Sequence, residues 1–231
     1  MHFSSSVFTS QVNHCLCLGL CFDVDNKHFL GSVSLNLKSR KGGFISKRDW
    51  ILSSAIPVHR MASPSRQNFA EECEAAINRQ INVELEASYA YLAFATYFGQ
   101  DTVALPHAEK FFLKQSHEER EHAEKLAKYQ NLRGGRVVYQ DIHKPTKTVF
   151  ASLRDAMETA LAMEKAVNES LLQLHALASQ HNDPALQDYL EGEFLKEQLE
   201  SISQFAHYIT QTKRAGTGLG EYLFDKLTLK D

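Results

Sequence analysis

Apolar residues recur at helical spacing through four long segments of this chain, and this pattern restricts its possible folds more than any other feature. The four segments and a short fifth one cover residues 69–98, 106–132, 149–180, 184–213 and 218–228. A period of 3.6 residues sustained over such lengths is typical of amphipathic helices rather than strands. We therefore expect an all-α domain in which each long helix buries one face.

Turn-forming sequences separate the helical segments. FGQDTVALP follows the first, RGGR follows the second, HNDP lies between the third and fourth, and AGTGLG precedes the fifth. Asp183 and Pro184 have the positions of a helix cap and a first-turn proline. Only the link over residues 133–148 is long. A short loop, a long crossover and a short loop predict a four-helix bundle with one crossover, followed by a short C-terminal fifth helix.

Polar residues interrupt the middle of every predicted buried face. They are Glu84 in the first segment, Glu119 and His122 in the second, Glu164 in the third and Gln198 in the fourth. Glu119 and His122 are three residues apart, so they share one helix face. An unpaired buried charge costs several kcal/mol, roughly. Either the neighbouring helices supply counter-charges or a cation lies between them, and packed helices would bring these positions together.

The predicted buried faces of the second and fourth segments show how polar residues lie among apolar ones. The second segment would bury Phe112, Gln115, Glu119, His122, Leu126 and Tyr129, and the fourth would bury Leu190, Phe194, Gln198, Ile202, Phe205 and Ile209. Carboxylates with one imidazole and no thiolate suit iron or manganese better than structural zinc. Di-iron bundles usually carry one Glu on each of two helices and Glu-x-x-His on each of the others. Here Gln198 and Ser201 replace the second Glu-x-x-His.

This replacement makes the predicted pair of metal positions unequal. One position has Glu84, Glu119 and His122, whereas the other has Glu119, Glu164 and the neutral Gln198. The second position should therefore bind its metal weakly. Such asymmetry favours a protein that oxidises Fe(II) and releases the Fe(III) product over one that keeps a permanent di-iron cofactor.

Charge divides the chain into a basic leader and an acidic body. Residues 1–60 contain seven of the 25 Lys and Arg residues but only three of the 28 Asp and Glu residues. An acidic body argues against nucleic-acid binding and fits a cationic partner. No stretch reaches the roughly 20 apolar residues of a membrane-spanning helix, so a soluble body is expected. We predict a folded domain over residues 61–231 and an extension over residues 1–60 that is disordered.

The leader allows several interpretations. Its serines and basic residues are typical of a transit peptide to mitochondria or another organelle, although Asp23 and Asp25 are not. Its apolar stretch is also compatible with secretion, and an untargeted extension before a start at Met61 would leave the protein cytoplasmic, which we favour. Three of the four cysteines lie in the leader and only Cys73 lies in the body, so a disulfide framework is not expected.

Long stretches of the body resemble ferritin of the heavy-chain, ferroxidase type. They include EAAINRQINVELEASYAYL, FFLKQSHEEREHAEKLAKYQNLRGGR, LAMEKAVNESLLQLHALA, NDPALQDYLEGEFLKEQ and GLGEYLFDKLTL. The resemblance implies a ferritin-like bundle that oxidises Fe(II) with oxygen and stores ferric mineral inside a shell of two dozen subunits, composed either of this chain alone or of a mixture with other ferritin subunits. It also implies di-iron ferroxidase positions at Glu84, Glu119, His122, Glu164 and Gln198, with Tyr91 beside them.

The resemblance assigns roles outside the di-iron centre as well. Glu118 corresponds to a residue that passes iron inward, and Glu121 and Glu124 correspond to mineral-nucleating acids on the inner surface. Asp188 and Glu191 correspond to the acidic lining of threefold channels, where symmetry would concentrate negative potential.

Position 227 departs from the vertebrate heavy-chain pattern. Leu227 stands where His is often found, so a fourfold channel lined by the fifth helix would be more apolar.

Other interpretations of these residues are possible. A Glu-x-x-His sequence is usually a solvated helix face, Tyr91 alone would more often be core packing, and Glu121 with Glu124 would normally be a solubilising surface. At the level of function, the alternatives are a light-chain-like cage subunit without ferroxidase activity and a di-iron oxygenase or peroxidase bundle. The complete set Glu84, Glu119, His122 and Glu164 argues against the first, and the missing second Glu-x-x-His argues against the other.

Overall fold

The computed structural model describes residues 63–230, and helices account for most of them. The helices are α2 (Glu71–Phe98), α3 (Pro106–Leu132), α4 (Leu153–Gln180), α5 (Pro184–Leu190), the π-helical turn η1 (Glu191–Leu195), α6 (Lys196–Ala215) and α7 (Leu219–Thr228). No strand occurs within the described residues. The predicted extension over residues 1–60 lies outside them.

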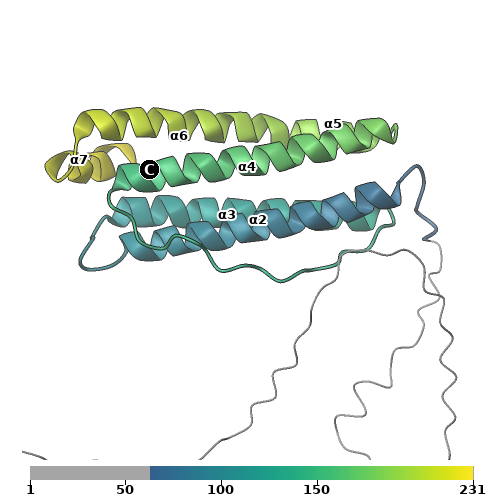
Figure 1. Cartoon of the computed structure of the whole chain (residues 1–231), viewed down its shortest axis with the longest axis horizontal. Helices are drawn as coiled ribbons and strands as arrows, with labels where there is room; N and C mark the ends of the chain where they lie inside the picture. Colours follow the sequence, from purple (N-terminus) through teal and green to yellow (C-terminus); the bar gives the residue numbers. More distant parts are fainter. Residues whose placement is uncertain (1–62, 231) are drawn as a thin grey trace, which may run out of the picture. The chain divides into compact units, whose positions relative to one another are not determined.

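Two antiparallel hairpins form the bundle. In Figure 1, α2 lies beside α3, and α4 lies beside the continuous rod of α5, η1 and α6. The link between α3 and α4 runs back along the length of the bundle, so α3 and α4 point in the same direction. The predicted all-α bundle with one long crossover and a short fifth helix is therefore confirmed.

Helix boundaries agree with the predicted segments except where a cap or an irregular turn intervenes. The third helix begins at Leu153 rather than near residue 149, because the Ser152 side chain accepts a hydrogen bond from the Asp155 amide at 3.1 Å. The predicted fourth helix is interrupted by η1, and it extends to Ala215 rather than residue 213. Turns of this π type are rare and occur frequently near functional sites.

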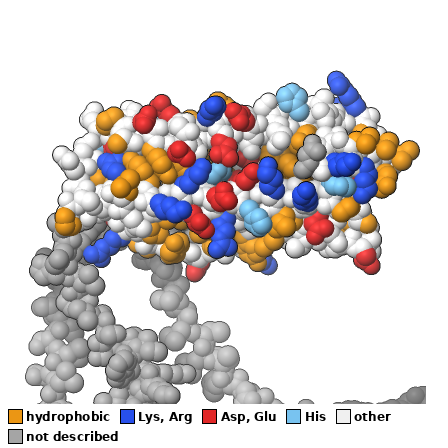
Figure 2. Space-filling model, turned by 180° about the vertical axis from the view of Figure 1, so that it is seen from behind, with side chains coloured by type: hydrophobic (Ala, Val, Ile, Leu, Met, Phe, Trp, Pro, Cys, Tyr) orange, Lys and Arg blue, Asp and Glu red, His pale blue; other side chains and the backbone are white. Residues whose placement is uncertain are grey.

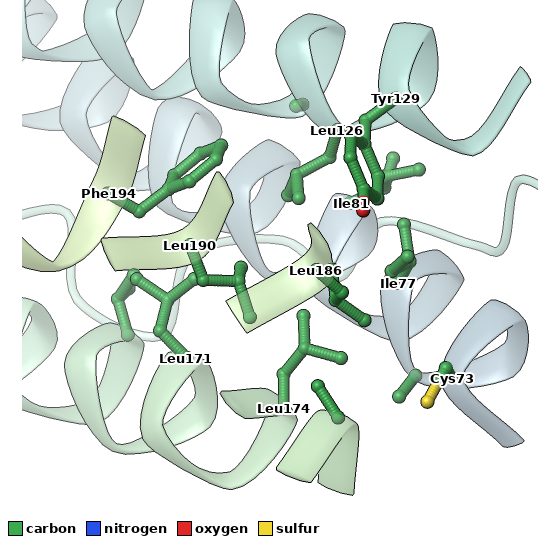
Figure 3. Close-up of a cluster of buried hydrophobic side chains, with 14 of the residues drawn as sticks. Cys73, Ile77, Ile81, Leu126, Tyr129, Leu171, Leu174, Leu186, Leu190 and Phe194 are labelled. Atoms are coloured by element: carbon green, nitrogen blue, oxygen red, sulfur yellow. The ribbon is translucent and has the colours of Figure 1, made fainter. Parts of the chain in front are cut away.

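Two apolar clusters fill the bundle, one on each side of its middle. The cluster in Figure 3 contains Cys73, Ile77 and Ile81 from α2, Leu126 and Tyr129 from α3, Leu171 and Leu174 from α4, and Leu186, Leu190 and Phe194 from the α5–η1 segment. The other cluster is rich in aromatic rings, including Tyr91, Phe94, Phe98, Phe112, Phe150 and Phe205. The polar residues predicted for the buried faces lie between these clusters along each helix. The core thus surrounds the candidate site with low-dielectric material.

An ion pair closes the bundle at the end of α3. The Arg133 guanidinium contacts the Asp183 carboxylate at 3.0 Å and 2.9 Å. Asp183 is 1 % exposed, and its side chain also accepts a hydrogen bond from the Leu186 amide, which makes it the N-cap of α5. The Asp183 carboxylate therefore joins the two hairpins. Its role as a helix cap was predicted, but its ion pair with Arg133 was not.

At the opposite end, α7 supplies acceptors to the first turns of two other helices. The buried Asp225 carboxylate accepts hydrogen bonds from the His107 and Ala108 amides at 3.0 Å and 2.8 Å. Glu221 accepts one from the Leu153 amide. Because the first amides of a helix have no intrahelical partner, α7 caps both α3 and α4. Figure 1 shows α7 at this end of the bundle.

Residues 63–230 include no helix that combines the length and the apolar character needed to cross a membrane.

Candidate metal centre

Glu84, Glu119 and His122 form a compact group of candidate metal ligands. One side-chain atom from each lies within 4.8 Å of the other two. Glu119 and His122 are one helical turn apart on α3, and the α2–α3 hairpin brings Glu84 opposite them. All three are buried, with exposures of 0 %, 5 % and 9 %. The predicted convergence of these residues is therefore present in the structure.

The two carboxylate oxygens of Glu84 have different surroundings. Its Oε1 accepts a hydrogen bond from Gln80 Nε2 at 2.8 Å. Its Oε2 is buried and receives no hydrogen bond from an N–H group or hydroxyl of the described residues, whereas the Glu84 and Glu119 carboxyls are close enough to share a proton. A buried oxygen without such a donor carries a large desolvation cost, and a cation within the group of three would remove that cost. Two carboxylates and one imidazole are suitable ligands for iron.

Glu164 lies in a second network beside this group. It accepts hydrogen bonds from the Tyr91 hydroxyl and from the Gln198 side-chain amide. Gln198 Nε2 also donates to the Glu164 backbone carbonyl at 3.0 Å. Glu164 does not belong to the group of three, but its charge acts on Glu119 strongly enough to raise the pKa of that carboxyl. The predicted ligands thus divide into two adjoining sets.

Burial gives the carboxyl groups of the centre a strong preference for the protonated form. Desolvation is the main cause of a pKa well above the ordinary value for Glu84, and the neighbouring Glu119 adds to it. Desolvation, followed by the charge of Glu164, raises the pKa of Glu119 to about 8. The pKa of Glu164 is also raised, again mainly by burial. A cation that binds here must displace protons, which couples its affinity to pH.

Tyr91 is held inside the aromatic cluster while its hydroxyl reaches the centre. Its ring stacks against Phe112 and Phe205 at centroid distances of 6.1 Å and 6.2 Å. Burial, and then the charge of Glu164, raises the pKa of this phenol well above its ordinary value. Tyr91 is thus packed in the core and donates a hydrogen bond to Glu164, and its role in the ferroxidase centre stays a prediction.

An acidic residue that helical periodicity assigned to the surface also contacts the centre. The Glu197 carboxylate lies 3.3 Å from His122 Nε2, although its side chain is about half exposed. Glu197 and the half-buried Glu118 line an open pocket of about 480 Å³ between α3 and α6. In the sequence, the position of Glu197 next to Gln198 was the one indication that it could reach the centre. Lys110 and Lys114 also line this pocket, and Glu84, Glu119 and His122 do not, so Glu197 is the residue that joins it to the buried group.

The other residues singled out by the resemblance lie away from the centre. Those on the surface of the described chain are Glu121, Glu124, Asp188, Glu191 and Leu227. Glu124 pairs with Arg120 at 3.5 Å, and Glu191 pairs with His175 at 2.7 Å. Figure 2 shows acidic and basic side chains interspersed on one face, with several acidic ones near its middle. The roles predicted for these five residues depend on an assembly of subunits and stay predictions.

A bundle of two antiparallel hairpins joined by one crossover, with carboxylates and an imidazole buried between its helices, defines the class of carboxylate-rich helical-bundle metal proteins. Residues 74–215 match the family model "Ferritin", described as a ferritin-like domain. The chain belongs to the ferritin family, as the sequence resemblance predicted.

Relatives from three invertebrates support this membership over nearly their whole lengths. The chain is 66 % identical over 170 residues to "Ferritin-2 heavy chain" of Schistosoma mansoni, covering 74 % of this chain and 99 % of that protein. It is 58 % identical over 167 residues to "Soma ferritin" of Lymnaea stagnalis, covering 72 % and 96 %. It is 59 % identical over 165 residues to "Ferritin heavy chain" of Echinococcus granulosus, covering 71 % and 95 %. The predicted heavy-chain resemblance is confirmed.

Proposed function

We propose that this protein is an iron-storage ferroxidase that oxidises Fe(II) with oxygen inside the bundle and sequesters the ferric product in a multi-subunit shell. The observation that carries the proposal is the group of Glu84, Glu119 and His122, whose ligand atoms lie within 4.8 Å of one another in a buried site. The buried Oε2 of Glu84, which receives no hydrogen bond from an N–H group or hydroxyl of the described residues, supports a cation at this point. The names of the heavy-chain relatives agree with it.

Each residue of the centre has a distinct part in this proposal. Glu84 and His122 hold the first Fe(II), and Glu119, which adjoins both sets of ligands, can bridge two iron ions. Glu164 holds the second ion. Its hydrogen bonds from Tyr91 and Gln198 fix the orientation of its carboxylate. As Fe(II) enters, the protonated carboxyls would release protons to solvent. Oxygen would then take one electron from each of two Fe(II) ions and, with two protons, leave as hydrogen peroxide, so that both irons become Fe(III).

The second iron position is built for transient occupancy. Gln198 directs its amide nitrogen toward Glu164, so it offers the metal only a neutral oxygen. Fewer charged ligands give weaker binding of Fe(III), which favours release toward Glu197 and Glu118 in the adjoining pocket. From there Glu121 and Glu124 would receive the ferric ion and nucleate the mineral.

Assembly completes the proposed storage function. Closed symmetry would repeat Asp188 and Glu191 around threefold axes, where their negative potential would draw Fe(II) inward. His175, which pairs with Glu191, belongs to the same surface. Fourfold contacts through α7 would place Leu227, 76 % exposed in the single chain, against other copies. Shells composed of this chain alone or mixed with related subunits would both satisfy this geometry.

A double substitution at the centre tests the proposal. Glu119→Ala with His122→Ala should abolish rapid Fe(II) oxidation in stopped-flow measurements, because it removes one bridging carboxylate and the imidazole. Arg154→Ala with Glu158→Ala, which removes an exposed pair on α4, is the matched control and should keep the wild-type rate. Rapid oxidation by a folded centre variant would refute the assignment. Slow oxidation by the wild-type shell would instead favour a cage subunit without ferroxidase activity.

A further inference from the structure

We infer that Gln80 and Ser170 act as a positioning pair that fixes the orientation of the Glu84 carboxylate for metal binding. Neither residue belongs to the group of candidate ligands. Gln80 is on α2, one helical turn before Glu84, and Ser170 is on α4. The inference rests on the proposed function and adds to it the residues that prepare one ligand in advance.

The contacts form a short chain that ends at the centre. The Ser170 hydroxyl donates to Gln80 Oε1 at 2.5 Å, and Gln80 Nε2 donates to Glu84 Oε1 at 2.8 Å. Gln80 is 1 % exposed, so water does not replace these partners. The Glu84 side chain is completely buried. Each link therefore joins groups that have few alternative hydrogen bonds.

These two hydrogen bonds favour one orientation of the Gln80 amide when Glu84 is ionised. With the observed orientation, the hydroxyl donates to the amide oxygen and the amide nitrogen donates to the carboxylate. If the amide turned over, its oxygen would face Glu84 Oε1, and two acceptors would meet once Glu84 is ionised, as it must be to bind a cation. The ionised Glu84 carboxylate thus selects the amide orientation, and the Ser170 hydroxyl supports it by donating a hydrogen bond to the amide oxygen.

The consequence for Glu84 is that its two oxygens have separate roles. Oε1 is held by Gln80, and Oε2 is buried and receives no hydrogen bond from an N–H group or hydroxyl within the described residues. Rotation of the carboxylate would break the only side-chain hydrogen bond that stabilises its charged form from α2. Glu84 is therefore prepared to offer Oε2 to the cation. Partners of this kind commonly determine ligand orientation and metal affinity.

The pair also makes ligand orientation depend on how the two hairpins pack. Gln80 and Glu84 belong to the α2–α3 hairpin, whereas Ser170 belongs to the α4–α6 hairpin. Ser170 is half-buried and lines a pocket of about 360 Å³ between α2, α4 and the crossover link. A contact made outside the centre therefore sets the geometry inside it.

The test uses Co²⁺, a divalent probe, on the metal-free full-length protein. Visible absorption and calorimetric titration give its affinity, and the part of the signal that is lost in Glu84→Ala defines the site. Gln80→Leu should weaken this Glu84-dependent binding by about 10- to 100-fold. Ser170→Ala should weaken it by less. Ser170→Thr retains the hydroxyl and should keep the wild-type affinity.

Ser88→Ala is the matched control. Ser88 is half-buried on α2, one turn after Glu84, and its hydroxyl donates to the Ser116 carbonyl at 2.7 Å rather than to a ligand. We expect wild-type Co²⁺ affinity in this variant, and melting temperatures of metal-free Ser170→Ala and Ser88→Ala that agree. If Ser170 had only a structural role, Ser170→Ala and Ser88→Ala would both lower the melting temperature and the Co²⁺ affinity.

Three results would overturn the inference. One is wild-type affinity in both Gln80→Leu and Ser170→Ala. Another is a Ser170→Thr variant as weak as Ser170→Ala, and the third is equal loss in the Ser88→Ala control. If any of these occurs while wild-type protein oxidises Fe(II) rapidly, only the positioning role fails. If wild-type protein shows neither rapid Fe(II) oxidation nor Glu84-dependent Co²⁺ binding, the proposed function fails with it.

Discussion

Replacing Glu119 by Gln should stabilise the metal-free protein, and more so as the pH rises. Glu119 is 5 % exposed, and burial together with the Glu164 charge raises its pKa from 4.5 to about 8. Between these pH values the unfolded chain releases a proton that the folded chain retains. Stability contributed by this group is therefore complete below pH 4.5 and declines as the pH rises toward 8.

The size of the effect follows from the two pKa values. A rise from 4.5 to about 8, at about 1.4 kcal/mol for each pH unit, corresponds to about 5 kcal/mol of unfolding free energy. This is an upper limit, because the pKa values of Glu84 and Glu164 are raised as well, and the protonation of one carboxyl affects that of its neighbours. For a domain of this size the upper limit corresponds to about 10–20 °C in melting temperature. Gln has nearly the same shape as Glu and carries no charge at any pH.

Calorimetric melting of the metal-free protein between pH 4.5 and pH 8 is the assay. Wild type and Glu119→Gln should have similar melting temperatures at the acidic end and diverge as the pH rises, with the variant more stable. Glu124→Gln, an exposed change on the same helix, is the control and should follow wild type. Parallel profiles for wild type and Glu119→Gln would refute the claim that burial destabilises the charged centre.

Three further changes, with Glu158→Ala as a control for the first, test other parts of the chain. Asp183→Ala should lower the unfolding free energy by about 3–5 kcal/mol, because it leaves Arg133 without its buried partner. Glu158→Ala, at an exposed pair, should change the unfolding free energy by less than about 1 kcal/mol in the same denaturant titration. Asp225→Ala should cost about 1–2 kcal/mol and accelerate hydrogen exchange in the first turn of α3, and unchanged exchange would contradict its capping role. A chain beginning at Met61 should still form shells by light scattering, since caps, core and loops all lie after it.

Helical periodicity predicted the centre of the buried face of α3 correctly, because that helix is regular over its whole length, but it did not include the flanking buried residues Ala108, Ser116, Ala123 and Gln130. All six of its predicted residues are buried, from Phe112 to Tyr129. The prediction was weaker for the fourth helix, where Ile202 and Ile209 are only half-buried. Gln198 and Phe205 on the same face are buried, so the π turn η1 before them leaves the predicted face in place and does not account for these two residues.

The sequence could not predict the long-range contacts of the site, and the reason is different. The Gln80 and Glu84 contact joins residues four apart on one helix, so spacing alone could have suggested it. Ser170 reaches Gln80 from 90 residues away, and that pairing depends on how the hairpins rotate against each other. Glu197 contacts His122 from outside the buried face of α6. Periodicity identifies the residues that face the core, but not those that reach it from the side.

The two caps supplied by α7 have a consequence for the order in which the protein can fold. α3 and α4 are synthesised well before residues 221 and 225, so their first turns lack these acceptors until α7 leaves the ribosome. During that interval the unpaired amides are free to fray. Completion of the bundle is therefore tied to the synthesis of α7, and a chain that stops before residue 221 loses the caps of two other helices as well as a surface helix.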